Sequence, residues 1–345
     1  MPIEQARNDE QIAPRLGLWD TVSIIVGIVV GTTIFRGTAP VFYNAGGPWT
    51  ALVLWPVGGL LTWCGAVCYA ELATTYPRDG GDYEYLNRAF GRGCGFLFAW
   101  SQLATIISAN IAIMAYAFAD YGARLWPAWD KPVPAAALTA VIALSALNAL
   151  GIVAGKITQN VLTATKILGI AGIVLAGVGF AFAKPTFSRR FPSPAAHSTS
   201  IALALVFVLY AFGGWAHAAY VAAEVRNQRR NLPRALGFGI AGITLIYLIV
   251  NAAYIGVLDF DVARRTATPA ADVMEHAFGS WGTNAVSKLV MLSALGAING
   301  MILTGTRVYA VWAADYPALN WLATWNRPRV APVAAIAVQA LVAIF

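Results

Sequence analysis

Long apolar segments separated by short polar linkers dominate this chain. A membrane helix needs about 20 apolar residues, and eight segments reach that length. A ninth begins near Pro332 and runs to the last residue, Phe345. The segments do not alternate between apolar and polar residues, as the strands of a membrane β-barrel do. The pattern therefore predicts an all-α integral membrane protein with about nine helices. The expected complete spans are residues 18–43, 49–75, 94–119, 133–154, 157–183, 200–223, 235–258 and 283–312.

Composition supports this interpretation and excludes several functions. Hydrophobic residues make up 59% of the chain and charged residues 11%, whereas a soluble domain has about 25% charged residues. The net charge is +7, but no basic face interleaved with aromatic residues suggests a nucleic-acid partner. The sequence has no cluster of His, Asp or Glu at metal-ligand spacing and no paired carboxylates within a span. We therefore expect no enzyme activity, no metal and no cofactor.

The distribution of Lys and Arg over the linkers predicts an orientation. More of them lie in the linkers that are cytoplasmic if the N-terminal tail, residues 1–17, is cytoplasmic. Basic residues favour the cytoplasmic side, so we expect a multi-pass protein of the cell inner (plasma) membrane with its N-terminus inside. Two inner linkers stand out. Residues 78–85 lead into an amphipathic stretch at 86–90, and residues 224–236 form the most basic linker.

A polar triplet interrupts the first span. Gly31, Thr32 and Thr33 stand in the apolar run of residues 22–35. Glycine weakens a helix, and threonine hydroxyls can bond to backbone groups. Non-helical backbone at membrane depth is tolerated only where it is buried in protein or lines a cavity. The triplet alone leaves two interpretations open, a break in the helix or a close contact between helices.

The sixth span has a matching interruption at Gly213 and Gly214. If the first five spans form one repeat, residues 18–183, and residues 200–345 form a second, incomplete repeat, the first and sixth spans correspond. Five is an odd number, so the two repeats have opposite orientations. Glycine-interrupted spans at corresponding positions of two repeats point to a transporter binding site.

Two breaks of this kind would create a receptor for a zwitterion. The helix that restarts after the first break presents free N–H groups, which suit a carboxylate. The helix that ends at the second break presents carbonyl groups, which suit an ammonium group. The two ends together predict an α-amino acid as the substrate.

Several stretches resemble the amino acid–polyamine–organocation (APC) transporter superfamily, and most of all its bacterial amino acid permeases and L-type-like transporters. They are "GTTIF" at 31–35, "YAELATTYPRDGGDYEY" at 69–85, "LYAFGGW" at 209–215, "EVRNQRRNL" at 224–232, and Asn299 with Gly300. The resemblance implies a LeuT-type fold with a five-plus-five inverted repeat, broken helices one and six, and alternating access. The family core has ten helices, and this chain ends within the ninth, so we interpret it as C-terminally truncated.

The resemblance also implies substrate-binding residues at both breaks and on the third span. They are Val29, Gly31, Thr32, Thr33, Asn110, Tyr210, Phe212 and Gly213. The triplet would bind the carboxylate, and the carbonyls of Val29, Tyr210 and Gly213 would bind the amine. Tyr210 has the position of the outer gating aromatic. The sequence departs from the family at Thr33, where glycine is usual, and at Ala216, where L-type members have asparagine.

Lys166 is the candidate coupling residue. An ionisable side chain within a span indicates a function by default, and the resemblance places Lys166 where sodium-coupled relatives bind sodium. Two roles remain open, a proton carrier and a charged tether between spans one, five and eight. Sodium coupling is disfavoured in both. We expect His217, just after the second break, to be a hydrogen-bonded packing residue.

The sequence therefore favours a secondary active transporter of neutral amino acids, either proton-coupled or an exchanger. No acidic residue is placed to receive a cationic side chain, and no second basic residue is placed to receive an anionic one. The expected partners are an amino acid, the lipid bilayer and protons; the oligomeric state is left open. The alternative is an amino acid-binding membrane sensor that does not transport, or an inactive fragment.

Overall fold

The computed structural model describes residues 14–76, 78–126, 133–183, 199–325 and 331–344, and these are almost entirely helical. Among them, five helices are long and apolar enough to cross a membrane. They comprise Pro48–Thr75, Arg92–Leu125, Ile152–Gly177, Gln228–Leu258 and Ser280–Ala314. The prediction of an all-α membrane protein is confirmed.

Each predicted span contains helix. The first span is α2 (Leu18–Val29), α3 (Thr33–Arg36) and α4 (Ala39–Ala45), and the second is α5 (Pro48–Thr75). The third is α7 (Arg92–Ser101), η1 (Gln102–Ile106) and α8 (Ile107–Leu125), the fourth and fifth are α9 (Val133–Ala149) and α10 (Ile152–Ala183), and the sixth is α11 (Ile201–Ala211) and α12 (His217–Tyr220). The seventh, eighth and ninth are α13 (Gln228–Leu258), α16 (Ser280–Ala314) and α17 (Val333–Ile344). Shorter elements connect them, namely α6 (Asp82–Phe90), η3 (Ala222–Glu224), α14 (Phe260–Ala263), α15 (Pro269–Phe278) and η4 (Pro317–Ala323).

The seventh span differs from the prediction at its start. The sequence placed residues 224–236 in a linker, but α13 already begins at Gln228. Its first turns are amphipathic, because Leu232 and Leu236 are buried while Arg230 and Arg234 are exposed. A prediction from the length of the apolar run therefore missed the first turns of α13, which have a charged outer face. The amphipathic stretch expected at 86–90 likewise begins earlier, as α6 at Asp82.

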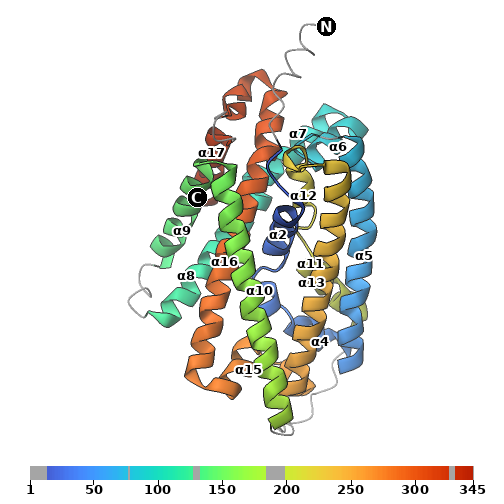
Figure 1. The fold of residues 1–345 in the computed structure, drawn as a ribbon, viewed down its shortest axis with the longest axis vertical. Coiled ribbons are helices and arrows are strands. Elements are labelled where there is room, and N and C mark those ends of the chain that lie inside the picture. The colour runs from blue at the N-terminus through green and yellow to red at the C-terminus, as the bar shows by residue number, and fades with distance from the viewer. Residues whose placement is uncertain (1–13, 77, 127–132, 184–198, 326–330, 345) are drawn as a thin grey trace.

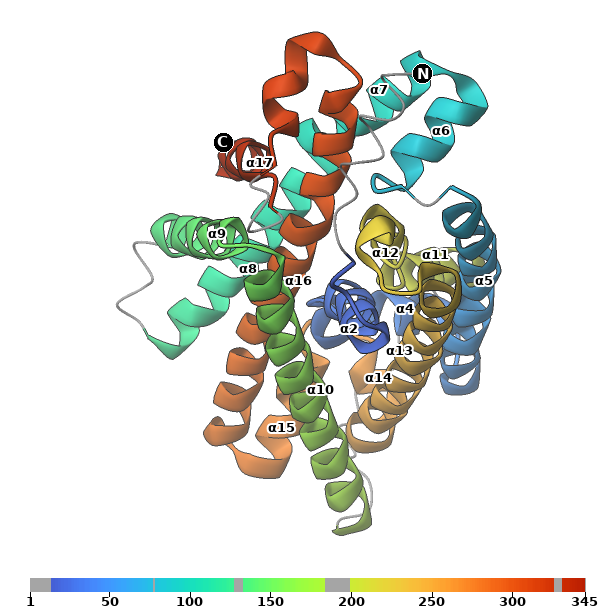
Figure 2. The same cartoon turned by 45° about the horizontal axis from the view of Figure 1, so that its top comes forward.

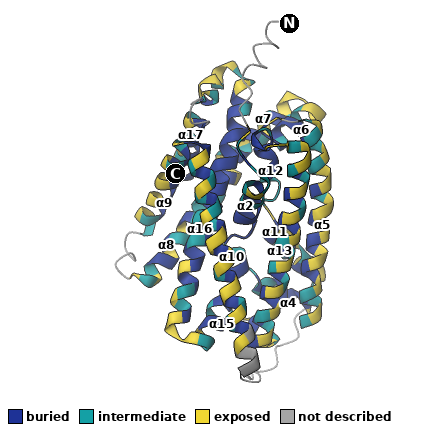
Figure 3. Cartoon of the chain, viewed as in Figure 1, coloured by how far each residue is buried: buried dark blue, intermediate teal, exposed yellow. Residues whose placement is uncertain are grey.

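Helix α2 lies at the centre of the bundle (Figures 1 and 2). It packs against α13 on one side and against α10 and α16 on the other. Helices α5 and α13 pack together, and α8, α9 and α16 form a second group. Figure 3 shows that α2 is largely buried, and its side chains from Ile24 to Val29 have little or no exposed surface. A broken helix can persist here because protein surrounds its backbone.

Both predicted breaks are present. Helix α2 ends at Val29 and α3 starts at Thr33; α11 ends at Ala211 and α12 starts at His217. Gly214 lies in the second break with φ +101°, and a Cβ added there would come within 2.7 Å of Ile28 Cγ2. Glycine is needed at this position for its backbone angle and for the close approach of the two breaks.

The bundle has two distinct ends, visible in Figure 1. One carries α6, η3 and the first described residues, and we call it the α6 end. The other carries α4 and α15, and we call it the α15 end. Helix α16 runs from the α15 end to the α6 end. At the α6 end, Leu16 forms an isolated parallel bridge with Val225, just after η3.

Candidate functional site

A cavity of about 260 Å³ lies between the two helix breaks and the helices α8 and α16. Its lining is mainly apolar, with a few hydroxyl, amide and imidazole groups. It consists of Ile28, Val29, Gly31, Thr33, Ile106, Asn110, Met114, Tyr210, Ala211, Gly213, Gly214, His217, Ala297 and Met301. These lining residues include no Asp, Glu, Lys or Arg. The cavity can therefore hold a small molecule without placing a formal charge beside it.

Most of the residues expected at the substrate site line this cavity. They are Val29, Gly31, Thr33, Asn110, Tyr210 and Gly213. Tyr210, the expected gate, is 70% exposed. The amide of Asn110 donates to the carbonyl of Ile106 on its own helix at 2.8 Å.

Two of the expected residues do not line the cavity. Thr32 lies beside it, where its hydroxyl is 3.8 Å from the sulfur of Met114. Phe212 is only 1% exposed, and its ring packs edge-on against Tyr247 with the centroids 5.3 Å apart. A Cβ on Gly58 of α5 would be 3.4 Å from the Phe212 ring, so this ring fills the space between α5 and α13. The structure does not support direct contact between Phe212 and a ligand in the cavity.

The carbonyls expected to bind an amine already have internal donors. The Val29 carbonyl accepts from the N–H of Gly31 at 2.8 Å, and the Tyr210 carbonyl accepts from the N–H of Gly213 at 3.0 Å. The Tyr247 hydroxyl lies 3.0 Å from the Val29 carbonyl and 2.8 Å from the Ala211 carbonyl. A phenol has one proton, so it can serve only one of these two carbonyls fully at a time. Tyr247 thus links the ends of α2 and α11, a role that the sequence did not reveal.

Lys166 and Ser293 hold the other side of the first break. In an unbroken helix, the Gly27 carbonyl would accept from the N–H of Gly31, which here turns to Val29. The Lys166 ammonium replaces it, donating to Gly27 at 2.9 Å and to Val30 at 2.6 Å. Ser293 Oγ lies 3.1 Å from the Val30 carbonyl and 2.9 Å from the Gly31 carbonyl.

These contacts join the first, fifth and eighth spans at one point. Lys166 comes from α10, and its side chain is fully buried. Ser293 comes from α16, and both reach the end of α2. The arrangement is the one that the tether hypothesis expects, whereas the proton-carrier role stays a prediction.

His217 forms a hydrogen bond with α16 and also lines the cavity. Its Nδ1 is 2.9 Å from the hydroxyl of Thr304, and that hydroxyl donates to the carbonyl of Gly300 at 2.8 Å. Because the hydroxyl proton is used on Gly300, Thr304 accepts from His217, so the hydrogen bonds assign the proton to Nδ1. His217 also lines the cavity. The signal in the sequence was its position just after the second break, next to Ala216, where L-type members have asparagine.

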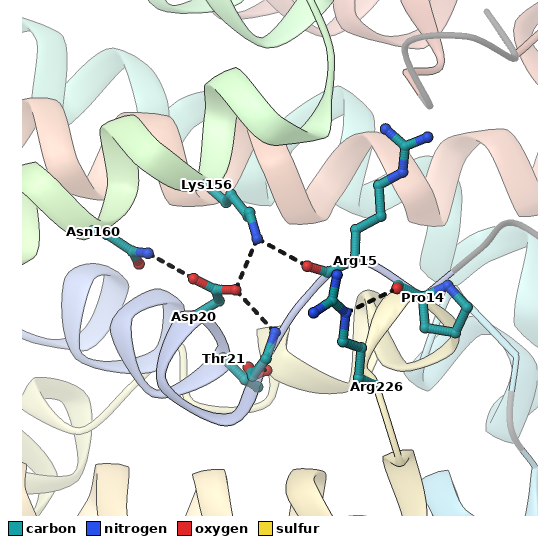
Figure 4. A network of polar contacts seen from close by, with 8 residues as sticks. Pro14, Arg15, Asp20, Thr21, Lys156, Asn160 and Arg226 are labelled. Carbon is teal, nitrogen blue, oxygen red and sulfur yellow. Dashed lines mark hydrogen bonds and ion pairs between the residues drawn. The ribbon is translucent and has the colours of Figure 1, made fainter.

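The α6 end is closed by charged groups. The Lys156 ammonium contacts Asp20 at 3.1 Å and the carbonyl of Arg15 at 2.9 Å, and the amide of Asn160 donates to Asp20 at 2.6 Å (Figure 4). The Arg226 side chain donates to the carbonyl of Pro14 at 3.2 Å. These contacts fix the first described residues, 14–16, against α10 and the segment after η3.

A buried ion pair lies behind this layer. Glu224 and Arg307 meet at 2.7 Å, and both side chains are at most 1% exposed. Asp79 accepts from the N–H of Ala223 at 2.9 Å. Burial and the nearby Glu224 carboxylate raise the pKa of Asp79 to about 8, although Arg307 acts in the opposite direction. Arg307 lies one helical turn beyond Thr304 on α16. The Glu224–Arg307 pair therefore lies between the cavity and the charged groups at the α6 end.

Comparisons with known proteins test the fold and the family of this chain. The chain matches the family model for amino acid permeases over residues 16–345. It is 31% identical to the b(0,+)-type amino acid transporter 1 of Mus musculus, with 96% of this chain and 69% of that protein covered. It is 32% identical to the large neutral amino acids transporter small subunit 2 of Rattus norvegicus, with coverages of 93% and 62%.

Solved structures support the same architecture. Mhp1, a nucleobase-cation-symport-1 family transporter, superposes with a TM-score of 0.61 at 12% identity, covering 97% of this chain and 73% of that one. A Na⁺-coupled sialic acid symporter gives the same TM-score and identity, with coverages of 96% and 71%. At this identity the likeness shows the fold alone, and the expected LeuT-type fold is confirmed. Family membership also confirms that the chain is a transporter and not an enzyme. The chain belongs to the amino acid permease family.

Proposed function

We propose that this chain is a secondary active transporter of neutral amino acids that works by alternating access. The observation that carries the proposal is the cavity between the two helix breaks, which offers backbone groups and no charged side chain. A zwitterion needs one donor end and one acceptor end, and broken helices supply both. Membership of the amino acid permease family supports the same substrate class.

Backbone groups near Gly31 and Thr33 would bind the substrate carboxylate. The first N–H groups of a helix have no acceptor within that helix, and α3 starts at Thr33 beside the cavity. The carbonyls of Val29, Tyr210 and Gly213 would receive the amine. Val29 and Tyr210 already accept internal hydrogen bonds, so the amine would share or displace those donors.

The other walls favour an uncharged side chain on the substrate. Ile28, Met114 and Met301 are apolar, and Ala297 leaves room between them. Burying a charged side chain among such groups is unfavourable without a partner of opposite charge. The polar groups Asn110 and His217 can contact a polar but neutral side chain.

Orientation and coupling complete the proposal. The α6 end is rich in arginine, including Arg88, Arg92, Arg229 and Arg230, which supports a cytoplasmic location for this end of the bundle. The protein would then span the cell inner (plasma) membrane with its N-terminus inside. Residues 18–183 and 200–345 would be the two inverted repeats. Lys166 would couple transport to protons, or hold the break while the protein exchanges one amino acid for another.

Uptake into liposomes tests the proposal. The full chain is reconstituted, and uptake of radiolabelled neutral, cationic and anionic amino acids is measured. We expect saturable uptake of a neutral subset, and its loss in Thr33→Trp, which fills the cavity. Thr165→Trp is the matched control, because Thr165 is exposed on α10. Unchanged uptake by Thr33→Trp would refute the site, and binding without uptake by the native chain would favour a sensor.

A further inference from the structure

A second concave site lies on the outside of the bundle, away from the substrate cavity. It is a groove of about 730 Å³ between α5 and α13, near the α6 end. Its α5 side runs from Trp63 to Thr75, and its α13 side runs from Arg229 to Gly237. The lining residues recur at intervals of three and four, so each helix contributes one continuous face. Neither the proposed transport function nor the comparisons assign a role to this groove.

The depth of the groove comes from small residues. Ala66 and Ala70 on α5 and Gly237 on α13 lie along it. A Cβ on Gly237 would come within 3.0 Å of the Trp63 ring, so any side chain there would press against the indole. From Trp63 to Thr74 the groove extends about 16 Å along α5, at about 1.5 Å per residue. This length is close to one leaflet of a hydrocarbon core about 30 Å thick.

The end of the groove nearest the α6 end is positively charged. Arg229 lines it, and Arg230 and Arg234 are exposed on the adjacent face of α13. Within the described residues, none of these three arginines has an acidic side chain at ion-pair distance. Glu71 is the one acid among the lining residues and balances Arg229, so the positive charge at this end comes from the adjacent Arg230 and Arg234.

We propose that this groove binds one anionic phospholipid of the leaflet at the α6 end. One acyl chain lies over Ala66, Ala70 and Gly237, and the phosphate contacts Arg229 and Arg230. Arginine matches a phosphate in geometry as well as in charge, because its planar guanidinium donates two parallel hydrogen bonds. The occupant is therefore a lipid with a net negative headgroup, because the ammonium group of a zwitterionic headgroup would be repelled by the excess of positive charge at this end.

The lipid would contact the two helices that support the second break. Gly65 of α5 packs against Trp215, because a Cβ on Gly65 would be 3.1 Å from that ring. Tyr247 of α13 contacts the ends of α2 and α11. A lipid wedged between α5 and α13 would thus favour one spacing of the helices that hold Trp215 and Tyr247.

Native mass spectrometry of the full chain in detergent tests the proposal. Phosphatidylglycerol and phosphatidylcholine with identical acyl chains are titrated separately. We expect phosphatidylglycerol to bind with clear preference. We also expect Arg229→Gln/Arg230→Gln to weaken its binding roughly thirty-fold, at about 1 kcal/mol per basic residue. Arg92→Gln is the control, because Arg92 is an exposed arginine at the same end but on α7. It should leave lipid binding unchanged.

Two groove-filling variants locate the acyl chain. Gly237→Leu should abolish bound phosphatidylglycerol. Val67→Trp should do the same from an exposed position that tolerates a larger side chain, so a folding defect at Gly237 would not end the test. Equal binding of both lipids by the native chain would overturn the choice of an anionic lipid. Full binding by the double arginine variant, or by Val67→Trp, would overturn the location.

Discussion

The first helix is held in different ways at its two ends. At the break, carbonyls at the end of α2 and just after it receive hydrogen bonds from Lys166, Ser293 and Tyr247, and none of these donors is an acidic side chain. At the α6 end, Asp20 of α2 forms an ion pair with Lys156, and behind it Glu224 of η3 forms an ion pair with Arg307 of α16. The break thus uses backbone groups, whereas the α6 end uses paired side-chain charges.

This difference matches two separate tasks. A site built from backbone groups can recognise the common part of all amino acids and leave the side chain to the apolar walls. A layer of paired charges can separate and form again when the surrounding helices move, because each charged group can be solvated once exposed to water. We therefore expect mutations at the break to affect substrate and those at the α6 end to affect conformation.

The largest effect is expected from the buried pair at the α6 end. Arg307→Met leaves the Glu224 carboxylate buried without its partner, which costs about 3–5 kcal/mol of unfolding free energy. The apparent unfolding temperature in detergent should fall strongly. The double variant Arg307→Met/Glu224→Gln removes both charges and should recover much of the loss. Equal stabilities of the single and double variants would mean that the pair is not the cause.

Lys166→Met should have the next largest effect on stability and the largest on transport. It leaves the buried Gly27 carbonyl without a donor, at about 1–3 kcal/mol for an unmade hydrogen bond. The geometry of the break would relax, and uptake should be lost. Lys156→Met, at the partly exposed pair, is the control and should retain uptake. Retained uptake with an unaltered pH profile in Lys166→Met would contradict both a coupling and a positioning role.

Asp79 makes the α6 end sensitive to pH. Its pKa is about 8 in the fold and about 3.9 in an unfolded chain, so the native state binds more protons between these values. Stability from this group is therefore fully present below about pH 4 and is lost as the pH rises through 8. Asp79→Asn keeps an acceptor for the Ala223 N–H and should remove this loss. Thermal unfolding of both proteins from pH 5 to 9 measures it, and parallel curves would contradict the assignment.

The sequence predicted the break better than the α6 end, for a physical reason. Glycine and threonine within an apolar run are local signals, so Gly31 and Gly213 could be located from the chain alone. The family resemblance then supplied Asn110 and Tyr210, which line the cavity. It also supplied Phe212, whose ring instead packs against Tyr247, because the direction of a side chain at a break depends on the exact backbone angles.

The contacts of the α6 end are long-range and have no local pattern. Glu224 and Arg307 are 83 residues apart, and Asp20 and Lys156 are 136 apart. In the sequence these residues resembled ordinary charges at helix ends, where water satisfies them. Tyr247 was missed for a similar reason, since an aromatic residue within a span usually packs and only the fold brings its hydroxyl to α2.

The smallest effect is expected at the partly exposed pair near the N-terminus. Asp20→Asn removes one charge from the contact with Lys156, but its amide can still accept a hydrogen bond. Pairs with partial exposure contribute about 0–1 kcal/mol, so the unfolding temperature should change little. The closure of the α6 end should loosen nevertheless, because Asp20 and the Arg15 carbonyl share Lys156. A cysteine placed at Thr163, which contacts Ser23 on α2, should then react faster with a water-soluble maleimide in Asp20→Asn than in the parent. Equal rates would mean that the buried Glu224–Arg307 pair alone keeps water from α2 and that the contact between Asp20 and Lys156 does not help to close the α6 end.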